Sequence, residues 1–476
     1  MLLHAMFDMS TPPHYHHNHD NNSSSIIISS RQRPNFISRF ILGPSFAEAE
    51  LTNLFATLSS LPEKAADALL SGFLACSGRF FSLFYHQGNY SDGESGTGTG
   101  KGMKEREGGE GGDYYAYSAK AVRELRSLEL GLAGGLATGV GKRERERKKP
   151  QQGRGDNVVV VASADLVLAL VLGLGVVTFD LLDSGLHAHS ICRYTLGLMS
   201  QPTVGLGLDD DDGGGGGDGG GGGHGGEFES QLLPLMHMDS CNCLVRRQIP
   251  AYRLRPRRPE GVDRYIGLCV SLLPVVYDLC CVSSRLDGVD DGSGVSTARK
   301  SYEEDGLSGV ETAVRNWSPS LRKEDAAKLT PTEIQVIVTQ ATVYQTAVLL
   351  FIHRLRFPFG VEDEMATSMA ASVLDDVRSL YHAPGHRGSE AGRDQNSIPF
   401  EYRMGLPFLI AAAELQDGIQ RTQALELLEW VVWKRMYPRV GELLRRFVLY
   451  VWEARDRGWQ GHWVDLTARG PQFVLF

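Results

Sequence analysis

The stretch that decides the fold is LTPTEIQVIVTQATVYQTAVLLFIHRLRFPFG, residues 329–360. Thr330 fits a helix N-cap, Pro331 fits the first helical position, and Glu333 completes a Thr-x-x-Glu capping box. Apolar residues then recur at alternating spacings of three and four, which is the period of one buried helix face. They are Ile334, Ile337, Ala341, Tyr344, Val348, Phe351 and Leu355. Because Pro358 ends this pattern, we predict one long helix that begins at Pro331 and stops before Pro358.

The segments on both sides of this helix have the same character. Residues 361–381 carry Glu362, Asp363 and Glu364 in the first turn of a predicted helix, where acids favour the positive end of the helix dipole. Residues 264–286 predict an apolar helix pair broken near Pro274. Because no run of any length alternates with period two, we expect an all-α fold, a large helical domain of stacked antiparallel helix pairs.

Composition limits the classes of function. The chain has 476 residues, of which 42% are hydrophobic, so it can bury a substantial core. A net charge of −9 does not suit a protein that coats nucleic acid or an anionic membrane. The seven cysteines follow no framework spacing, which predicts reduced, intracellular thiols.

Low-complexity tracts divide the chain. Residues 1–34 predict a disordered tail, and residues 35–476 one helical domain. Inserts that lack the side chains to repay their ordering entropy interrupt this domain, and we expect them to be disordered. They span residues 91–113, 141–156, 205–227 and 286–305. The Lys/Arg-rich insert at 141–156 is typical of a nuclear-import signal or of a solvated loop.

An apolar run at residues 158–179 is long enough to span a bilayer. Asp165 lies inside it, and an acid in the hydrocarbon costs roughly 2.5–3.5 kcal/mol. We therefore favour a buried helix that forms a hairpin with a second helix in residues 181–199. A membrane-attached helical protein that uses residues 158–179 is the alternative.

Motifs that would carry chemistry are missing. The chain contains no Gly-x-Ser-x-Gly elbow, no His-Glu-x-x-His and no Rossmann fingerprint, so we do not expect an enzyme. His187 and His189 are two residues apart and would lie on different helix faces, so they do not form a metal pair. The histidine run at 14–19 is more typical of a disordered tail than of a metal site. No residue is assigned as catalytic, cofactor-binding or metal-ligating, and no cofactor is expected.

The last seventy residues carry a family signature. Leu406-Pro407-Phe408 opens an apolar helix, and a charged helix and a Trp-rich tail end the chain at Phe473 to Phe476. The other matching residues are Val451-Trp452-Glu453, Arg455-Asp456, Gly458, Trp463-Val464-Asp465 and, further upstream, Asn316 to Ser320. With these residues the chain resembles the fungal-specific transcription factor domain, the regulatory region of Zn2Cys6 zinc-cluster proteins. The resemblance covers residues 35–476 and is most distinctive in the last 210.

The resemblance implies an all-α regulatory domain, a nuclear location and regulation of RNA polymerase II transcription. Transcription machinery or co-regulator proteins are the implied partners, together with a homodimer and a small-molecule inducer. The family's zinc cluster needs six cysteines in Cys-x2-Cys spacings. This chain offers only Cys241-Asn242-Cys243 and the adjacent Cys280 and Cys281, which puts direct DNA binding in doubt. Regulation would then act through protein contacts, or through a cluster lost from this chain.

The tryptophans of the tail suggest packing more than binding. Trp452, Trp459 and Trp463 lie close to Arg455 and Asp456 at helical spacing. Such a group usually closes a helix end through salt bridges and aromatic burial. We therefore expect this tail to complete the helical domain.

Overall fold

The computed structural model describes nine stretches of the chain. The described residues are 63–88, 114–128, 156–199, 225–254, 262–263, 265–286, 297–382, 403–431 and 437–476. Their regular structure is helical throughout, apart from one isolated bridge between Asp263 and Gly267. The all-α prediction is confirmed for this part of the chain.

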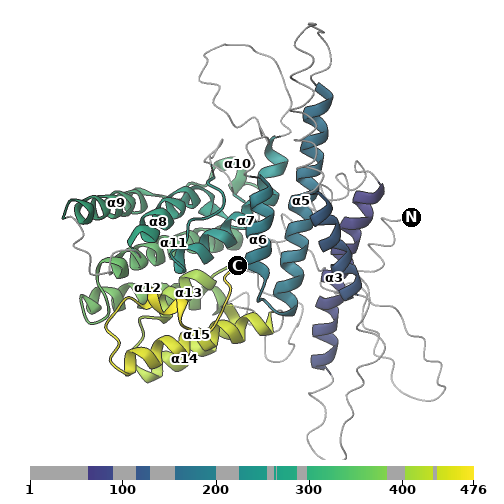
Figure 1. The fold of residues 1–476 in the computed structure, drawn as a ribbon. Helices are drawn as coiled ribbons and strands as arrows, with labels where there is room; N and C mark the ends of the chain where they lie inside the picture. The colour runs from purple at the N-terminus through teal and green to yellow at the C-terminus, as the bar shows by residue number, and fades with distance from the viewer. Residues whose placement is uncertain are drawn as a thin grey trace, which may run out of the picture.

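Helices that are neighbours in sequence mostly pack against one another (Figure 1). The α-helices before residue 300 are α3 (Glu63–Gly88), an unlabelled helix at 114–128, α5 (Asp156–Asp183), α6 (Ala188–Met199), α7 (Gly225–Val245), α8 (Leu273–Leu286) and the start of α9 (Thr297–Asn316). Those after it are α10 (Lys323–Ala326), α11 (Pro331–Arg356), α12 (Asp363–His382), α13 (Gly405–Ala412), α14 (Gly418–Val431) and α15 (Pro438–Asp456). Two 3₁₀ helices, η2 (Leu268–Leu272) and η3 (Trp463–Ala468), complete the helices of the described residues.

Two apolar cores lie between these helices. The larger core joins α7, α8, α11 and the C-terminal helices, which occupy the left half of Figure 1, and it also includes side chains of α3, α5 and α6. The smaller core joins α3, the helix at 114–128 and the middle of α5, on the right of the figure. Helix α6 lies between α5 and α7, so the α5–α6 pair connects the two halves.

The predicted hairpin at 158–199 forms, with α5 and α6 as its arms. Asp180 closes the turn between them, because its carboxylate accepts hydrogen bonds from the Ser184 hydroxyl at 2.8 Å and from the His187 backbone N–H at 3.0 Å. The two arms approach closely at Gly173, where a Cβ atom would lie 2.3 Å from the Thr195 side chain. Glycine is therefore required at this crossing.

The stretch quoted first folds as expected. The Thr330 side chain accepts a hydrogen bond from the Glu333 N–H at 3.2 Å, and the Glu333 carboxylate accepts one from the Thr330 N–H at 2.8 Å. This is the predicted capping box, and α11 ends at Arg356, two residues before Pro358. Most of α11 is buried, since α9, η2, α12 and α13 all pack against it.

One predicted insert is wrong in part. The insert at 286–305 was expected to be disordered, but α8 includes Leu286 and α9 already begins at Thr297. Residues 297–305 are rich in Ala, Arg, Lys and Glu, which favour a helix, and Leu307 and Val310 then anchor α9 in the core. The inserts at 141–156 and 205–227 likewise overlap the first residues of α5 and α7. The tail at 1–34 and the insert at 91–113 lie outside the described residues.

Among the described residues, two stretches are long and apolar enough to cross a membrane by length and composition, Leu268–Leu286 and Pro331–Arg356. Both pack inside the helical core, with 44% and 67% of their most apolar windows buried. This is weak evidence for a membrane span, because core helices have the same composition. In α5, which contains the run at 158–179, the described side chains from Leu168 to Leu182 are mostly buried against α3, α6 and α7.

Candidate functional site

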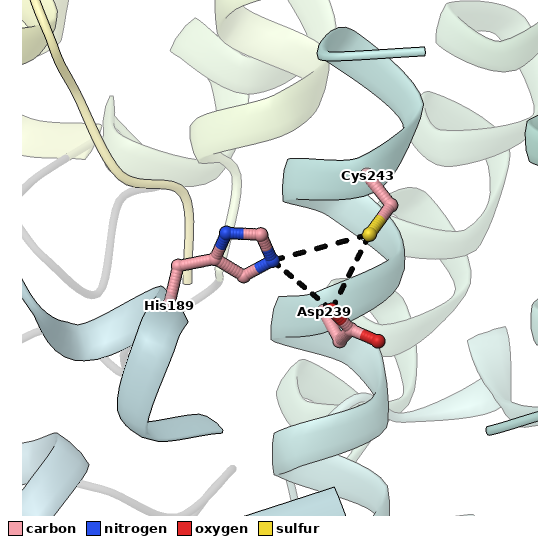
Figure 2. Close-up of side chains that lie close together, drawn as sticks. All are labelled: His189, Asp239 and Cys243. Carbon is pink, nitrogen blue, oxygen red and sulfur yellow. Dashed lines mark hydrogen bonds and ion pairs between the residues drawn. The ribbon is translucent and has the colours of Figure 1, made fainter. Parts of the chain in front are cut away.

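Three side chains from two helices meet where α6 contacts α7 (Figure 2). His189 Nε2 lies 3.0 Å from Asp239 Oδ1 and 3.9 Å from Cys243 Sγ. The Cys243 thiol donates to Asp239 Oδ1 over 3.3 Å. Asp239 and Cys243 are buried, whereas His189 is partly exposed. We call these three residues the His189 cluster.

Local structure explains how the cluster is assembled. Asp239 and Cys243 are four residues apart on α7, so one helical turn places both on the same face. His189 lies in the first turn of α6, directly after the turn that Asp180 closes. The α5–α6 hairpin therefore carries His189 to α7, 50 residues away in sequence from Asp239.

A neighbouring arginine fixes the proton on the imidazole. Arg246 Nη1 lies 3.0 Å from His189 Nδ1, and a guanidinium can only donate. Nδ1 therefore accepts, and the ring proton sits on Nε2, where it is donated to Asp239. Burial lowers the pKa of His189, so the imidazole is neutral at pH 7.

The charges in the cluster follow from these contacts. Burial raises the pKa of Asp239, but hydrogen bonds from His189 and from the Ala251 amide, at 2.6 Å, outweigh it and bring the pKa below its usual value. Burial and the Asp239 charge raise the pKa of the Cys243 thiol well above its usual value. The cluster thus holds one carboxylate, a neutral imidazole and a protonated thiol. Arg193 Nε lies 3.8 Å from the carboxylate at the exposed edge.

The same face of α7 holds the segment at 471–476. The Asn242 amide donates to the Leu475 carbonyl at 2.6 Å and accepts from the Leu475 N–H at 3.1 Å. Arg246 donates to the Phe473 carbonyl and lies 5.5 Å from the centre of the Phe473 ring. Arg246 therefore contacts both this segment and the His189 cluster. Its side chain connects the polar face of α7 to a segment that is otherwise apolar and buried.

A second polar group lies at the junction of α11, α12, α13 and α15. Arg354 Nε and Nη2 donate to the Glu414 carboxylate at 2.7–3.0 Å, and Nη2 also donates to Asp363 at 2.7 Å. Arg455 Nη2 donates to the other oxygen of Asp363 at 3.0 Å. We call Arg354, Asp363, Glu414 and Arg455 the Arg354 ion group. Its two positive and two negative charges balance.

Aromatic rings complete this junction as the sequence predicted. The centre of the Phe359 ring lies 5.3 Å from Arg354 Cζ and 4.1 Å from Arg455 Cζ. Trp452 donates its N–H to the Ala412 carbonyl at 2.7 Å, and Trp463 is fully buried against Phe351. The tryptophans of the tail therefore pack the domain.

A small cavity lies between α7, α8 and α11. It measures about 10 Å³ and is lined by His237, Cys241, Cys269 and Tyr344 among others. The His237 ring contacts the Tyr344 hydroxyl at 2.9 Å, and burial lowers the pKa of His237 to about 3. This volume is roughly that of one water molecule, whereas drug-sized ligands need some 300 Å³ or more. The small-molecule inducer stays a prediction.

The structure brings together residues that the sequence did not connect. His187 lies on the exposed turn before α6, outside the cluster that His189 joins. Asp239 was not singled out, and Cys243 was considered only beside Cys241, although the Asp-x3-Cys spacing on an apolar helix was a readable signal. Only the tertiary fold shows that His189 faces them.

Comparison with known proteins gave one match. The family model for the fungal specific transcription factor domain matches residues 226–476, from the first turn of α7 to the last residue of the chain. Helices α3 to α6 lie before the matched range. No curated protein and no solved structure matches the chain. The match spans more than half of the sequence, so the chain belongs to the fungal specific transcription factor domain family.

Proposed function

We propose that this protein regulates RNA polymerase II transcription in the nucleus, through contacts of its helical domain with transcription machinery or co-regulator proteins. The observation that carries the proposal is the family match over residues 226–476. A homodimer and a small-molecule inducer belong to the same proposal. Direct DNA contact does not, because the seven free cysteines are spread over α3, α6, α7, η2 and α8 and never take the Cys-x2-Cys spacing.

The His189 cluster supports a non-enzymatic role. Cys, His and Asp also form nucleophilic triads, but there the histidine accepts the proton of the thiol. Here the His189 Nε2–H donates to Asp239, and the Cys243 thiol donates to the same carboxylate. Because the pKa of this thiol is raised, the cluster does not prepare a thiolate for attack.

A tethering experiment tests the proposal. The full chain is fused to an unrelated sequence-specific DNA-binding domain and expressed in a fungal cell that carries a reporter behind the matching operator. We expect a several-fold change in reporter transcript, and no change from a reporter without the operator. A folded, nuclear fusion that leaves transcription unchanged would contradict the proposal.

Cell fractionation tests the membrane alternative. Burial of the described half of α5 supports a chain that is released without detergent. Extraction of the full chain by detergent alone would instead favour membrane attachment through residues 158–179. Imaging of the tagged chain then tests the nuclear location directly.

A further inference from the structure

We propose that His189, Asp239 and Cys243 form a binding site for a divalent transition metal, with Zn²⁺ as the best fit. The donor set is one imidazole nitrogen, one carboxylate oxygen and one thiol sulfur, and all three atom types are usual zinc ligands. This departs from the expectation drawn from the sequence, which assigned no metal ligand.

The separations of the three ligand atoms suit one ion. Zinc ligands at tetrahedral angles lie about 3.3–3.6 Å from one another, given bond lengths of about 2.0–2.3 Å. In the His189 cluster the three separations are 3.0, 3.3 and 3.9 Å. Small side-chain rotations would bring all three atoms to an ion. Two of the ligands share one turn of α7, which keeps their spacing rigid.

The surroundings prepare Asp239 and His189 for binding a metal ion. The second oxygen of Asp239 is held by the Ala251 amide at 2.6 Å, so the first oxygen is oriented toward the cluster. Burial keeps the His189 imidazole neutral, which is the form that binds metals. The His189 side chain is 14% exposed, which leaves an edge through which an ion can enter.

The hydrogen bond from Arg246 to His189 competes with metal binding and therefore lowers the affinity of the site. Coordination needs the lone pair of His189 Nε2, so the ring proton moves to Nδ1. Arg246, which donates to Nδ1 in this structure, must then turn away. The Cys243 thiol also releases its proton to solvent on binding. Metal and the Arg246 hydrogen bond exclude each other, so we expect an exchangeable site that fills as free Zn²⁺ rises.

This competition makes a specific prediction for Arg193. Its Nη1 lies 3.7 Å from Cys243 Sγ and its Nε 3.8 Å from Asp239 Oδ1, and the side chain is 38% exposed. Replacing it by glutamine removes a positive charge next to the ion without removing a ligand. We expect Arg193→Gln to bind Zn²⁺ roughly fivefold more tightly than the parent chain.

Zinc titration of the full, chelator-stripped chain tests the proposal. All variants carry His14, His16, His17 and His19 replaced by glutamine, which removes the histidine run as a competing site. We expect one Zn²⁺ per chain, release of about one proton from the thiol, and a thiolate-to-metal absorption band with Co²⁺. Cys243→Ser should weaken binding at least tenfold and remove the band. Cys76→Ser, a matched buried thiol on α3, should change neither.

Two results would overturn the proposal. One is the absence of saturable binding to the parent chain up to about 100 μM Zn²⁺, the range of very weak complexes. The other is binding that Cys243→Ser and Arg193→Gln both leave unchanged. Thermal unfolding of each metal-free variant is measured in parallel. Should Cys243→Ser not fold, the tighter binding expected of Arg193→Gln still decides the question.

Discussion

The His189 cluster and the Arg354 ion group are both polar, both lie between helices, and both join distant parts of the chain. They differ in how their charges are balanced. In the ion group, two arginines and two carboxylates face one another, and Arg354 and Glu414 are 1% and 0% exposed. In the His189 cluster, a single carboxylate is surrounded by a neutral imidazole, a thiol and an amide, and the arginines lie toward the edge.

Because of this difference, the Arg354 ion group has a purely structural role, whereas the His189 cluster can change its protonation and bind an ion. Every oxygen of Asp363 and Glu414 already has a guanidinium partner, and Arg354 Nη1 also donates to the Val361 carbonyl at 3.0 Å. All four carboxylate oxygens are therefore already engaged within the protein. The His189 cluster contains two protons that can move, on His189 and on Cys243, so its state depends on pH and on metal.

The ion group should give the largest loss of stability. Glu414→Gln removes the buried one of the two carboxylate charges that face Arg354, itself a buried cation, and we expect a loss of about 3–5 kcal/mol in the free energy of unfolding. Chemical denaturation of parent and variant measures it. A double variant, Arg354→Met with Glu414→Leu, should lose less than the sum of its single changes, because it leaves no unpaired charge at Glu414. Additive losses would mean that the pair is not coupled.

Acid should lower the stability of the folded protein through a buried histidine on α7. His237, one turn before Cys241 on α7, has a pKa of about 3 in the folded protein and about 6.5 when unfolded. The unfolded chain therefore binds more protons between these values, and stability is lost as the pH falls below about 6.5. By pH 5 this histidine alone costs about 2 kcal/mol, and the lowered pKa of His189 acts in the same direction.

Denaturation at pH 7 and pH 5 checks this effect. His237→Gln cannot take up the proton, so its stability should fall by about 2 kcal/mol less than that of the parent chain. His187→Gln is the matched control, because it replaces an exposed histidine on the turn before α6 and leaves the buried His237 in place. An equal pH dependence in the parent and in His237→Gln would show that His237 does not titrate as a buried group.

The sequence predicted what local patterns determine. The capping box at Thr330 and Glu333, the break near Pro274 and the hairpin around Asp180 all depend on residues within a few positions of each other. The start of α9 was missed because the glycines and serines just before Thr297 indicate a loop. The helix-forming residues that follow were therefore assigned to the same loop. The contacts of His189 with Asp239, and of Asn242 with Leu475 across 233 residues, depend on how whole helices pack, which no local pattern records.

A smaller loss is expected in the His189 cluster. Asp239→Asn keeps the shape of the side chain but removes the charge. An amide NH2 group replaces one carboxylate oxygen, and this donor then faces another donor, the Ala251 amide or the His189 N–H. We expect a loss of about 1–3 kcal/mol, below that of Glu414→Gln, because the neighbouring arginines reach solvent and His189 is neutral. Denaturation at pH 7 compares the two. A loss in Asp239→Asn that exceeds the loss in Glu414→Gln would reverse our ranking of the two polar groups.

The smallest effect should come from a pair that matches the ion group in chemistry but not in burial. Arg421 donates to both oxygens of Asp456 at 2.6 and 2.8 Å, but the Asp456 side chain is 58% exposed. Water screens such a pair and solvates either charge when its partner is lost, so Asp456→Asn should cost at most about 0.5 kcal/mol. The measurement is the same denaturation at pH 7, repeated at high salt, where the difference should vanish. A loss near that of Glu414→Gln would mean that bidentate geometry, and not burial, makes the Arg354 ion group strong.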